Sequence, residues 1–262
     1  MELNGQPADP AALRALALTN YGHFTTMRVD DGRVRGLALH LERLDRDCRA
    51  VFGTVLDTTR VRELVRRAVT GPSSHGSGTF LVRVSVFDPD LDIVRPSAPA
   101  TPHVLITTRP AGPLPPAPLR VKSVPHVRDL PAVKHFGLFG ALHARRAAQL
   151  DGFDDALFHG PDDRVSEGGT WNVGFVDGDG RVVWPSGDVL PGVTMALLKQ
   201  HHPHTTRPVT VEEARGMQAV FATSTGIGVR AVSAVDTRVL STGHPVAAAL
   251  RSTYLALPGE VV

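Results

Sequence analysis

Lys134 is the residue of this chain whose type and setting point most directly to covalent chemistry. Lysine is scarce here, since only Lys122, Lys134 and Lys199 occur among the 28 basic residues. An amine that forms a Schiff base with a carbonyl must be kept partly out of water, so that it loses its proton near neutral pH. Apolar residues surround Lys134 in the sequence and favour that setting: Leu130, Val133, Phe136, Leu138 and Phe139.

Glu167 is the acidic residue that could work with such an amine. It lies in the glycine-containing stretch Ser166–Asn172. A carboxylate beside a pyridine nitrogen keeps that nitrogen protonated, and the ring can then accept the electrons of a carbanion. A surface acid in a turn is the alternative interpretation, because acidic residues are mostly exposed.

Three further segments could bind a phosphate. Gly192-Val193-Thr194 at a helix start would offer free backbone N–H groups and a hydroxyl, although an ordinary N-cap has the same pattern. Ser224-Thr225-Gly226 after an apolar strand offers two hydroxyls, or is a simple turn. Arg43 could bind an anion with both guanidinium nitrogens, or could pair with Asp47 on a solvated helix face. Each signal is weak when taken alone.

The elements that position these residues fall on either side of a proline-rich segment. Four prolines occur in residues 111–118, which favours an extended spacer. The sequence therefore predicts an N-terminal domain over residues 1–112, an interdomain linker over 113–120 and a C-terminal domain over 121–262. In the first domain the patterns predict strands over 24–29, 79–87 and 103–108, helices over 39–52 and 59–69, and a hairpin turn over 30–33.

The second domain is predicted to mix both kinds of element. Its helices are expected over 138–150 and from Gly192 onward, and its strands over 155–158, 173–176, 181–184 and 219–223.

Composition excludes several classes of function. The net charge of +2, with two Trp and two Tyr, argues against nucleic acid as a partner. No apolar run reaches the roughly 20 residues of a membrane span. The single Cys48 and the polar N-terminus predict a reducing, cytoplasmic location. The histidines of residues 201–204 lack a completing acid or Cys, so no metal site is expected.

Five segments follow one another along the chain in an informative order. They are His40–Leu44, Lys134, Phe153–Leu157 with Val165–Asn172, Leu190–Thr194, and Ser224-Thr225. Together they resemble the motifs of the class IV aminotransferases, the fold-type IV pyridoxal phosphate enzymes. That family includes branched-chain and D-amino acid aminotransferases and aminodeoxychorismate lyase. The resemblance covers nearly the whole chain.

The resemblance implies a fold, a cofactor and a site. The expected fold is two-domain α+β or α/β, similar to D-amino acid aminotransferase, with a small N-terminal α/β domain and a larger C-terminal domain containing a β-barrel-like sheet. Pyridoxal 5'-phosphate would be bound to Lys134, which is also the catalytic residue, and Glu167 would pair with the pyridine nitrogen. The implied phosphate-binding residues are Arg43, Val193, Thr194, Ser224 and Thr225. A homodimer is also expected.

Two activities remain open at this stage. The first is transfer of an amino group between an amino acid and a 2-oxo acid, which Glu167–Asn172 favours. The second is an aminodeoxychorismate lyase activity that releases pyruvate and 4-aminobenzoate, which the stretch Phe24–Val29 resembles. Phe24 and Phe139 stand where branched-chain aminotransferases carry tyrosines, and both are expected to contact substrate.

Two further alternatives concern single residues. Arg28 is a candidate ligand for a substrate carboxylate, or is a cation at a strand edge. A non-catalytic relative that only binds the cofactor would be expected to lose Lys134 or Glu167, and both are present.

Overall fold

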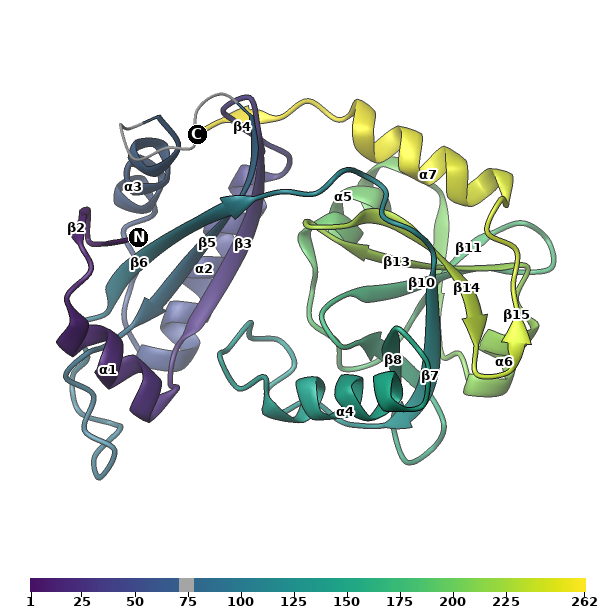
Figure 1. Ribbon diagram of the computed structural model, residues 1–262, viewed down its shortest axis with the longest axis horizontal. Helices are drawn as coiled ribbons and strands as arrows, with labels where there is room; N and C mark the ends of the chain where they lie inside the picture. The colour runs from purple at the N-terminus through teal and green to yellow at the C-terminus, as the bar shows by residue number, and fades with distance from the viewer. Residues whose placement is uncertain (71–77) are drawn as a thin grey trace. The chain divides into compact units, whose positions relative to one another are not determined.

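The structure of the protein is a computed structural model that describes residues 1–70 and 78–262. The chain divides into two compact units (Figure 1). The first unit contains Met1–Ala111, Val133–Gly137 and Pro258–Val262, and the second contains Gly112–Ala132 and Leu138–Leu257. Lys134 therefore belongs to the first unit, although it follows the proline-rich segment in the sequence.

The first unit is built on a seven-stranded antiparallel sheet of order β16-β4-β3-β5-β6-β1-β2 (Figure 1). Its strands are β1 (Glu2–Leu3), β2 (Gln6–Pro7), β3 (His23–Asp30), β4 (Arg33–Val34), β5 (Thr79–Phe87), β6 (His103–Pro110) and β16 (Glu260–Val261). Asp31 and Gly32 join β3 to β4, both with positive φ. That conformation suits the right-handed twist of a hairpin, and it confirms the turn predicted there.

Three helices accompany this sheet: α1 (Pro10–Thr19), α2 (Leu37–Phe52) and α3 (Thr58–Thr70). Alternate residues of the strands, such as Val82, Val84 and Val86 of β5, pack with Leu44 of α2 and Leu64 of α3 in one buried cluster. Helices α2 and α3 thus share a core with one face of the sheet. The predicted strands and helices of this part of the chain are confirmed, with boundaries shifted by up to two residues.

The second unit contains a nine-stranded sheet that closes on itself. Strand β9 pairs with both β8 and β10, so β10, β13, β14, β7, β8 and β9 form a six-membered ring. The strands are β7 (Leu119–Pro125), β8 (Asp155–His159), β9 (Val165–Gly168), β10 (Asn172–Val176), β11 (Val182–Pro185), β12 (His204–Arg207), β13 (Ala219–Ser224), β14 (Gly228–Val235) and β15 (Arg238–Val239). The mixed fold with a barrel-like sheet is therefore as predicted.

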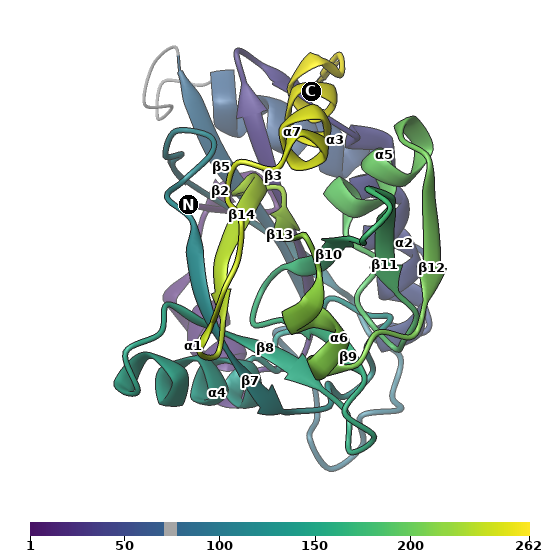
Figure 2. The ribbon, with the colours of Figure 1, turned by 90° about the vertical axis from the view of Figure 1, so that its right-hand side faces the viewer.

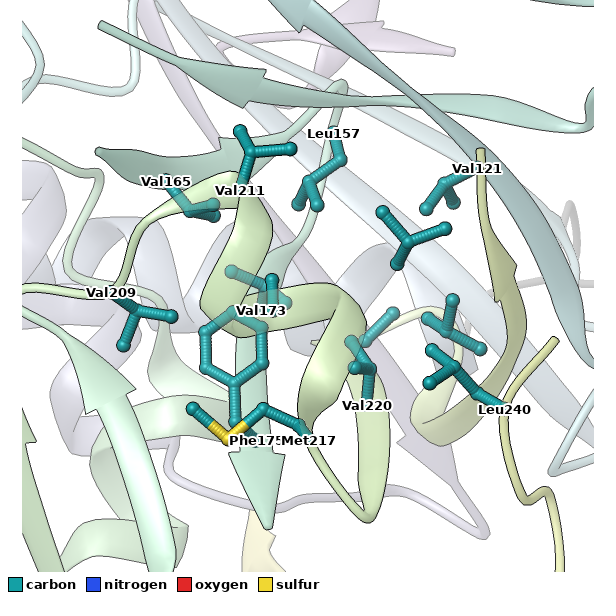
Figure 3. Close-up of a cluster of buried hydrophobic side chains, with 14 of the residues drawn as sticks. Val121, Leu157, Val165, Val173, Phe175, Val209, Val211, Met217, Val220 and Leu240 are labelled. Atoms are coloured by element: carbon teal, nitrogen blue, oxygen red, sulfur yellow. The ribbon is translucent and has the colours of Figure 1, made fainter. Parts of the chain in front are cut away.

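Branched apolar side chains from the ring form the largest core of this unit. Val121, Leu157, Val173 and Val220, each from a different strand, point toward one another around Phe175 (Figure 3). A sheet that closes with so few strands is narrow enough for side chains to fill its interior.

Four helices belong to the second unit: α4 (Phe139–Leu150), α5 (Val193–His201), α6 (Val211–Gly216) and α7 (Pro245–Ala256). Helix α4 lies alongside β7 and β8, where Ala144 and Ala148 pack on Ala156 and Phe158 (Figure 2). In the parts of the chain that the structure describes, no helix combines the length and the apolar character needed to cross a membrane.

Candidate active site

Lys134 is held against the first residues of β3 in the first unit. The N–H of Phe24 donates to the Lys134 carbonyl at 2.9 Å, and the N–H of Phe136 donates to the Gly22 carbonyl at 3.0 Å. His23 and His135 form an isolated antiparallel bridge between these two segments. The lysine is thus positioned by a short strand-like pairing rather than by a helix or a regular strand.

Aromatic rings form the surroundings of the lysine side chain. Lys134 Nζ lies 4.8 Å from the centroid of the Phe24 ring, which stacks on Phe136 at 5.9 Å. Both rings and Val133 are buried, whereas Leu130 is exposed. Of the five apolar residues predicted to surround Lys134, only Val133 and Phe136 are buried, and Phe139 is exposed like Leu130. The ring beside the amine is Phe24, which comes from a distant point of the sequence.

Arg83 is a residue of this region that sequence reasoning missed. It faces Thr26 across β5 and β3, and its guanidinium lies 3.7 Å from the Phe24 ring centroid. Burial lowers the pKa of Arg83. The strand register brings Arg83 to Phe24, and no local signal in the sequence reports that register.

Arg43 lies in a buried polar cluster on the side of β3 that faces α2. It donates through Nη2 to Thr25 Oγ1, which is 2.7 Å from His40 Nδ1. Burial, reinforced by the charges of Arg43 and Lys134, places the pKa of His40 well below its ordinary value. Arg43 is therefore a buried cation beside a neutral histidine, and it is not the solvated helix-face residue of the alternative interpretation.

Arg28 is also largely buried, and it has an acidic neighbour. Its Nε donates to Asp30 Oδ1 at 3.0 Å, and Arg35 pairs with the other oxygen of Asp30 at 2.7 Å. Burial alone would raise the pKa of Asp30, but the hydrogen bonds from Arg35 and Thr79 and the nearby Arg28 lower it. To bind a substrate carboxylate, Arg28 would have to share or break its ion pair with Asp30.

Glu167 is buried on β9 of the second unit, with only 4% of its surface exposed. One oxygen is 3.4 Å from Arg128 Nη1, and the other accepts the backbone N–H of Leu190 at 3.3 Å. Asn172, which is paired with Glu167 across β10 and β9, donates to the Leu190 carbonyl at 2.8 Å. Two of the predicted segments, the acidic stretch and the turn before α5, are thus brought into contact.

The first turn of α5 presents a buried hydroxyl. Gly192 is the N-cap, Val193 and Thr194 are buried, and the cap has no side-chain hydrogen bond. Among the residues that the structure describes, none hydrogen-bonds to Thr194 Oγ1. A buried hydroxyl without a partner is costly, and the N–H groups at a helix start attract anions. The turn is therefore suited to a phosphate.

Ser224 and Thr225 lie at the turn between β13 and β14, and both are partly buried. Ser224 contributes to the lining of a cavity of about 320 Å³ within the second unit. The other lining residues include Arg145, Thr170, Trp171 and Arg230. Ser224 is thus next to an open space.

Phe139 is the first residue of α4 in the second unit, and 82% of its surface is exposed. Its ring stacks on His143 at 5.9 Å.

No group of three or more His, Cys, Asp or Glu residues suited to a metal ion occurs within residues 1–70 and 78–262.

The first unit thus carries the Lys134 amine beside β3, and the second unit carries the buried Glu167 carboxylate on β9 and the Thr194 hydroxyl at the start of α5. Residues 22–235 match the amino-transferase class IV family. The chain therefore belongs to the class IV aminotransferase family, whose enzymes depend on pyridoxal phosphate.

Solved structures share the fold at low sequence identity. A branched-chain aminotransferase from Thermoproteus uzoniensis has 21% identity over 97% of this chain and 92% of its own, with a TM-score of 0.82. A hypothetical aminotransferase from Mycobacterium tuberculosis has 20% identity over 97% and 94%, with a TM-score of 0.80. A putative 4-amino-4-deoxychorismate lyase from Legionella pneumophila has 22% identity over 90% of each chain, with a TM-score of 0.77. No curated protein matches the chain in sequence.

The residues of the second unit fit the cofactor of this family. The Thr194 hydroxyl, which has no hydrogen-bond partner among the described residues, and the N–H groups at the start of α5 suit a phosphate. The Glu167 carboxylate suits a protonated ring nitrogen.

Proposed function

We propose that this protein is a pyridoxal phosphate-dependent aminotransferase that moves an amino group between an amino acid and a 2-oxo acid, with Lys134 as its catalytic residue. The observation that carries the proposal is the half-buried Lys134, which is fixed to β3 and has its amine beside the Phe24 ring. Its attachment to β3 distinguishes Lys134 from the other two lysines, since burial also lowers the pKa of Lys199. Lys122 is paired with Asp151, and Lys199 lies over the ring of Trp184.

The neutral form of a lysine amine is needed for attack on a carbonyl, and removal of an amine from water favours that form. When bound, pyridoxal phosphate supplies a ring that accepts electrons from the substrate Cα. Lys134 would be the group that moves a proton from the substrate Cα to the cofactor, as general base and general acid.

Glu167 holds the ring nitrogen protonated in this proposal. Arg128 and the Leu190 N–H both favour the ionised form of the Glu167 carboxylate. An ionised carboxylate can accept a hydrogen bond from the protonated ring nitrogen. The phosphate would be bound by Arg43, Val193, Thr194, Ser224 and Thr225. Phe24, Phe139 and Arg28 are the proposed substrate contacts.

Aminodeoxychorismate lyase activity, with release of pyruvate and 4-aminobenzoate, is the second candidate function. The specific observation in its favour is Phe24. This ring is buried against Arg83 and Phe136, and it has no hydroxyl to offer a substrate. The stretch Phe24–Val29 resembles that subgroup, and the Legionella pneumophila structure is named a putative lyase of this kind.

Absorption spectroscopy separates the candidates. The purified protein is mixed with pyridoxal phosphate, and then with a panel of L- and D-amino acids or with aminodeoxychorismate. Conversion of the cofactor band to that of pyridoxamine phosphate, with a 2-oxo acid as product, establishes transamination. A persistent band with release of pyruvate from aminodeoxychorismate establishes the lyase, and no band at all contradicts both. The homodimer and the cytoplasmic location expected from the sequence stay predictions.

A further inference from the structure

Asp47 is a fully buried carboxylate on α2, with no exposed surface. It lies one helical turn after Arg43, and both residues are on the buried face of the helix. A carboxylate in such a place is costly unless its oxygens are paired. The partners of Asp47 therefore indicate what this residue does.

Each oxygen of Asp47 has its own partner. Oδ1 accepts from Arg46 at 2.7 Å for Nη2 and 3.1 Å for Nε. Oδ2 accepts the backbone N–H of Lys134 at 2.9 Å, across 87 residues of sequence. A hydrogen bond to a charged acceptor is stronger than one between neutral groups. Helix α2 thus supplies a charged acceptor for the Lys134 N–H.

The bond from Asp47 completes the attachment of the Lys134 segment. The pairing with β3 uses the carbonyl of Lys134 and the N–H of Phe136, and it leaves the Lys134 N–H to the carboxylate. The peptide on either side of the lysine Cα is then fixed by two different elements, β3 and α2.

We propose that Asp47 is a positioning residue that fixes the Lys134 main chain through its N–H, so that helix α2 sets the point from which the lysine amine reaches the cofactor. The inference rests on the proposed function of Lys134 and deepens it. Arg43 and Asp47 share one helix face, so the proposed phosphate contact and the anchor of the lysine are held together by a single rigid element.

Two variants separate the hydrogen bond from the charge. Asp47→Asn keeps an oxygen that can accept the Lys134 N–H, whereas Asp47→Ala removes it. Glu42→Ala is the matched control, because Glu42 is an exposed carboxylate on the same helix. All four proteins are compared by circular dichroism before any other measurement.

The first readout is hydrogen exchange of single amides in the cofactor-free protein, measured by NMR. In Asp47→Ala the Lys134 amide is expected to exchange at least about tenfold faster, because it loses a charge-assisted hydrogen bond. The Phe24 and Phe136 amides bond to other groups and should keep their protection. In Asp47→Asn and Glu42→Ala the Lys134 amide should stay within about threefold of the wild-type rate.

The second readout is the rate at which pyridoxal phosphate becomes attached to Lys134, trapped by borohydride and located by peptide mass spectrometry. Asp47→Ala should slow attachment at least about tenfold, since small displacements of a reacting group are costly. Asp47→Asn should restore most of the rate. If wild-type Lys134 is never labelled, the proposed function fails, while the exchange measurement still tests the anchor.

Unchanged exchange of the Lys134 amide in Asp47→Ala would overturn the proposal. Loss of protection at Lys134, Phe24 and Phe136 together, in both Asp47 variants, would also overturn it, because Asp47 would then support the fold as a whole rather than the lysine. Normal attachment in Asp47→Ala despite a released amide would likewise contradict a positioning role.

Discussion

Asp155 and Trp171 are joined by a hydrogen bond of 2.8 Å from Trp171 Nε1 to Asp155 Oδ2. Arg145 pairs with both oxygens of the same carboxylate, also at 2.8 Å. The bond connects the start of β8 to the loop between β9 and β10, and this loop begins just after Gly168, the neighbour of Glu167. The stretches Phe153–Leu157 and Val165–Asn172, which form one motif in the sequence, are therefore joined by hydrogen bonds in the structure.

Gly168 is a sensitive point of that network. A Cβ at this position would lie 2.0 Å from an atom of the Trp171 ring, so Gly168→Ala forces the ring or the strand to move. We expect a loss of about 1–3 kcal/mol in the free energy of unfolding, measured in urea. Gly178→Ala is the control, since nothing lies within 4 Å of the added methyl group. Equal stability of the two variants would show that the ring adapts freely.

Thr194→Val tests the phosphate site at α5. Removal of the buried, unpartnered hydroxyl should leave the stability of the cofactor-free protein unchanged or raise it by up to about 1 kcal/mol. The Kd for pyridoxal phosphate should rise about tenfold, which corresponds to about 1.4 kcal/mol of binding free energy. Thermal melts and a fluorescence titration measure the two effects. A variant that binds the cofactor as tightly as the wild type would remove Thr194 from the site.

Lys134→Ala tests the catalytic assignment. Borohydride treatment with pyridoxal phosphate should add the cofactor mass to wild-type protein and not to the variant. The kcat should fall at least about 100-fold, the lower end of what a positioned general base contributes. Lys122→Ala, which removes an exposed amine paired with Asp151, should retain both properties. Labelling that persists in Lys134→Ala would place the reactive amine elsewhere.

Because His23 is buried, we expect the free energy of unfolding to depend on pH. Burial lowers its pKa to about 4, an effect that Asp47 opposes and Arg43 reinforces. In the unfolded chain the ordinary pKa of 6.5 applies, so the unfolded state binds this proton first as the pH falls. The stability due to neutral His23 is complete above pH 6.5 and is lost progressively toward pH 4.

Urea unfolding between pH 4.5 and 6.5 measures this effect. The wild-type free energy should fall with decreasing pH more steeply than that of His23→Leu, by about 1 kcal/mol per pH unit. His40, whose pKa is also lowered, adds a slope of the same sign in both proteins. Substitution of the exposed His204 by Gln should leave the slope unchanged. Parallel curves for wild type and His23→Leu would contradict a neutral buried His23.

The amino-acid sequence alone determined the local elements and the chemistry to look for. Alternation of valines along β5, the Asp31-Gly32 turn and the end of α2 at Gly53 are properties of neighbouring residues, so their patterns could be interpreted directly. The ordered motifs likewise indicated the family. The individual roles of Lys134, Glu167 and the phosphate-binding residues stay predictions.

Only the tertiary structure decided which distant residues meet. It brings Asp47 to the Lys134 N–H, Arg83 to the Phe24 ring and Arg128 to Glu167, and none of these three contacts was predicted from the sequence. Such contacts depend on strand register and on the closure of sheets over long stretches of chain. A shift of one residue would turn a side chain to the other face, and no local pattern records where the partner strand begins.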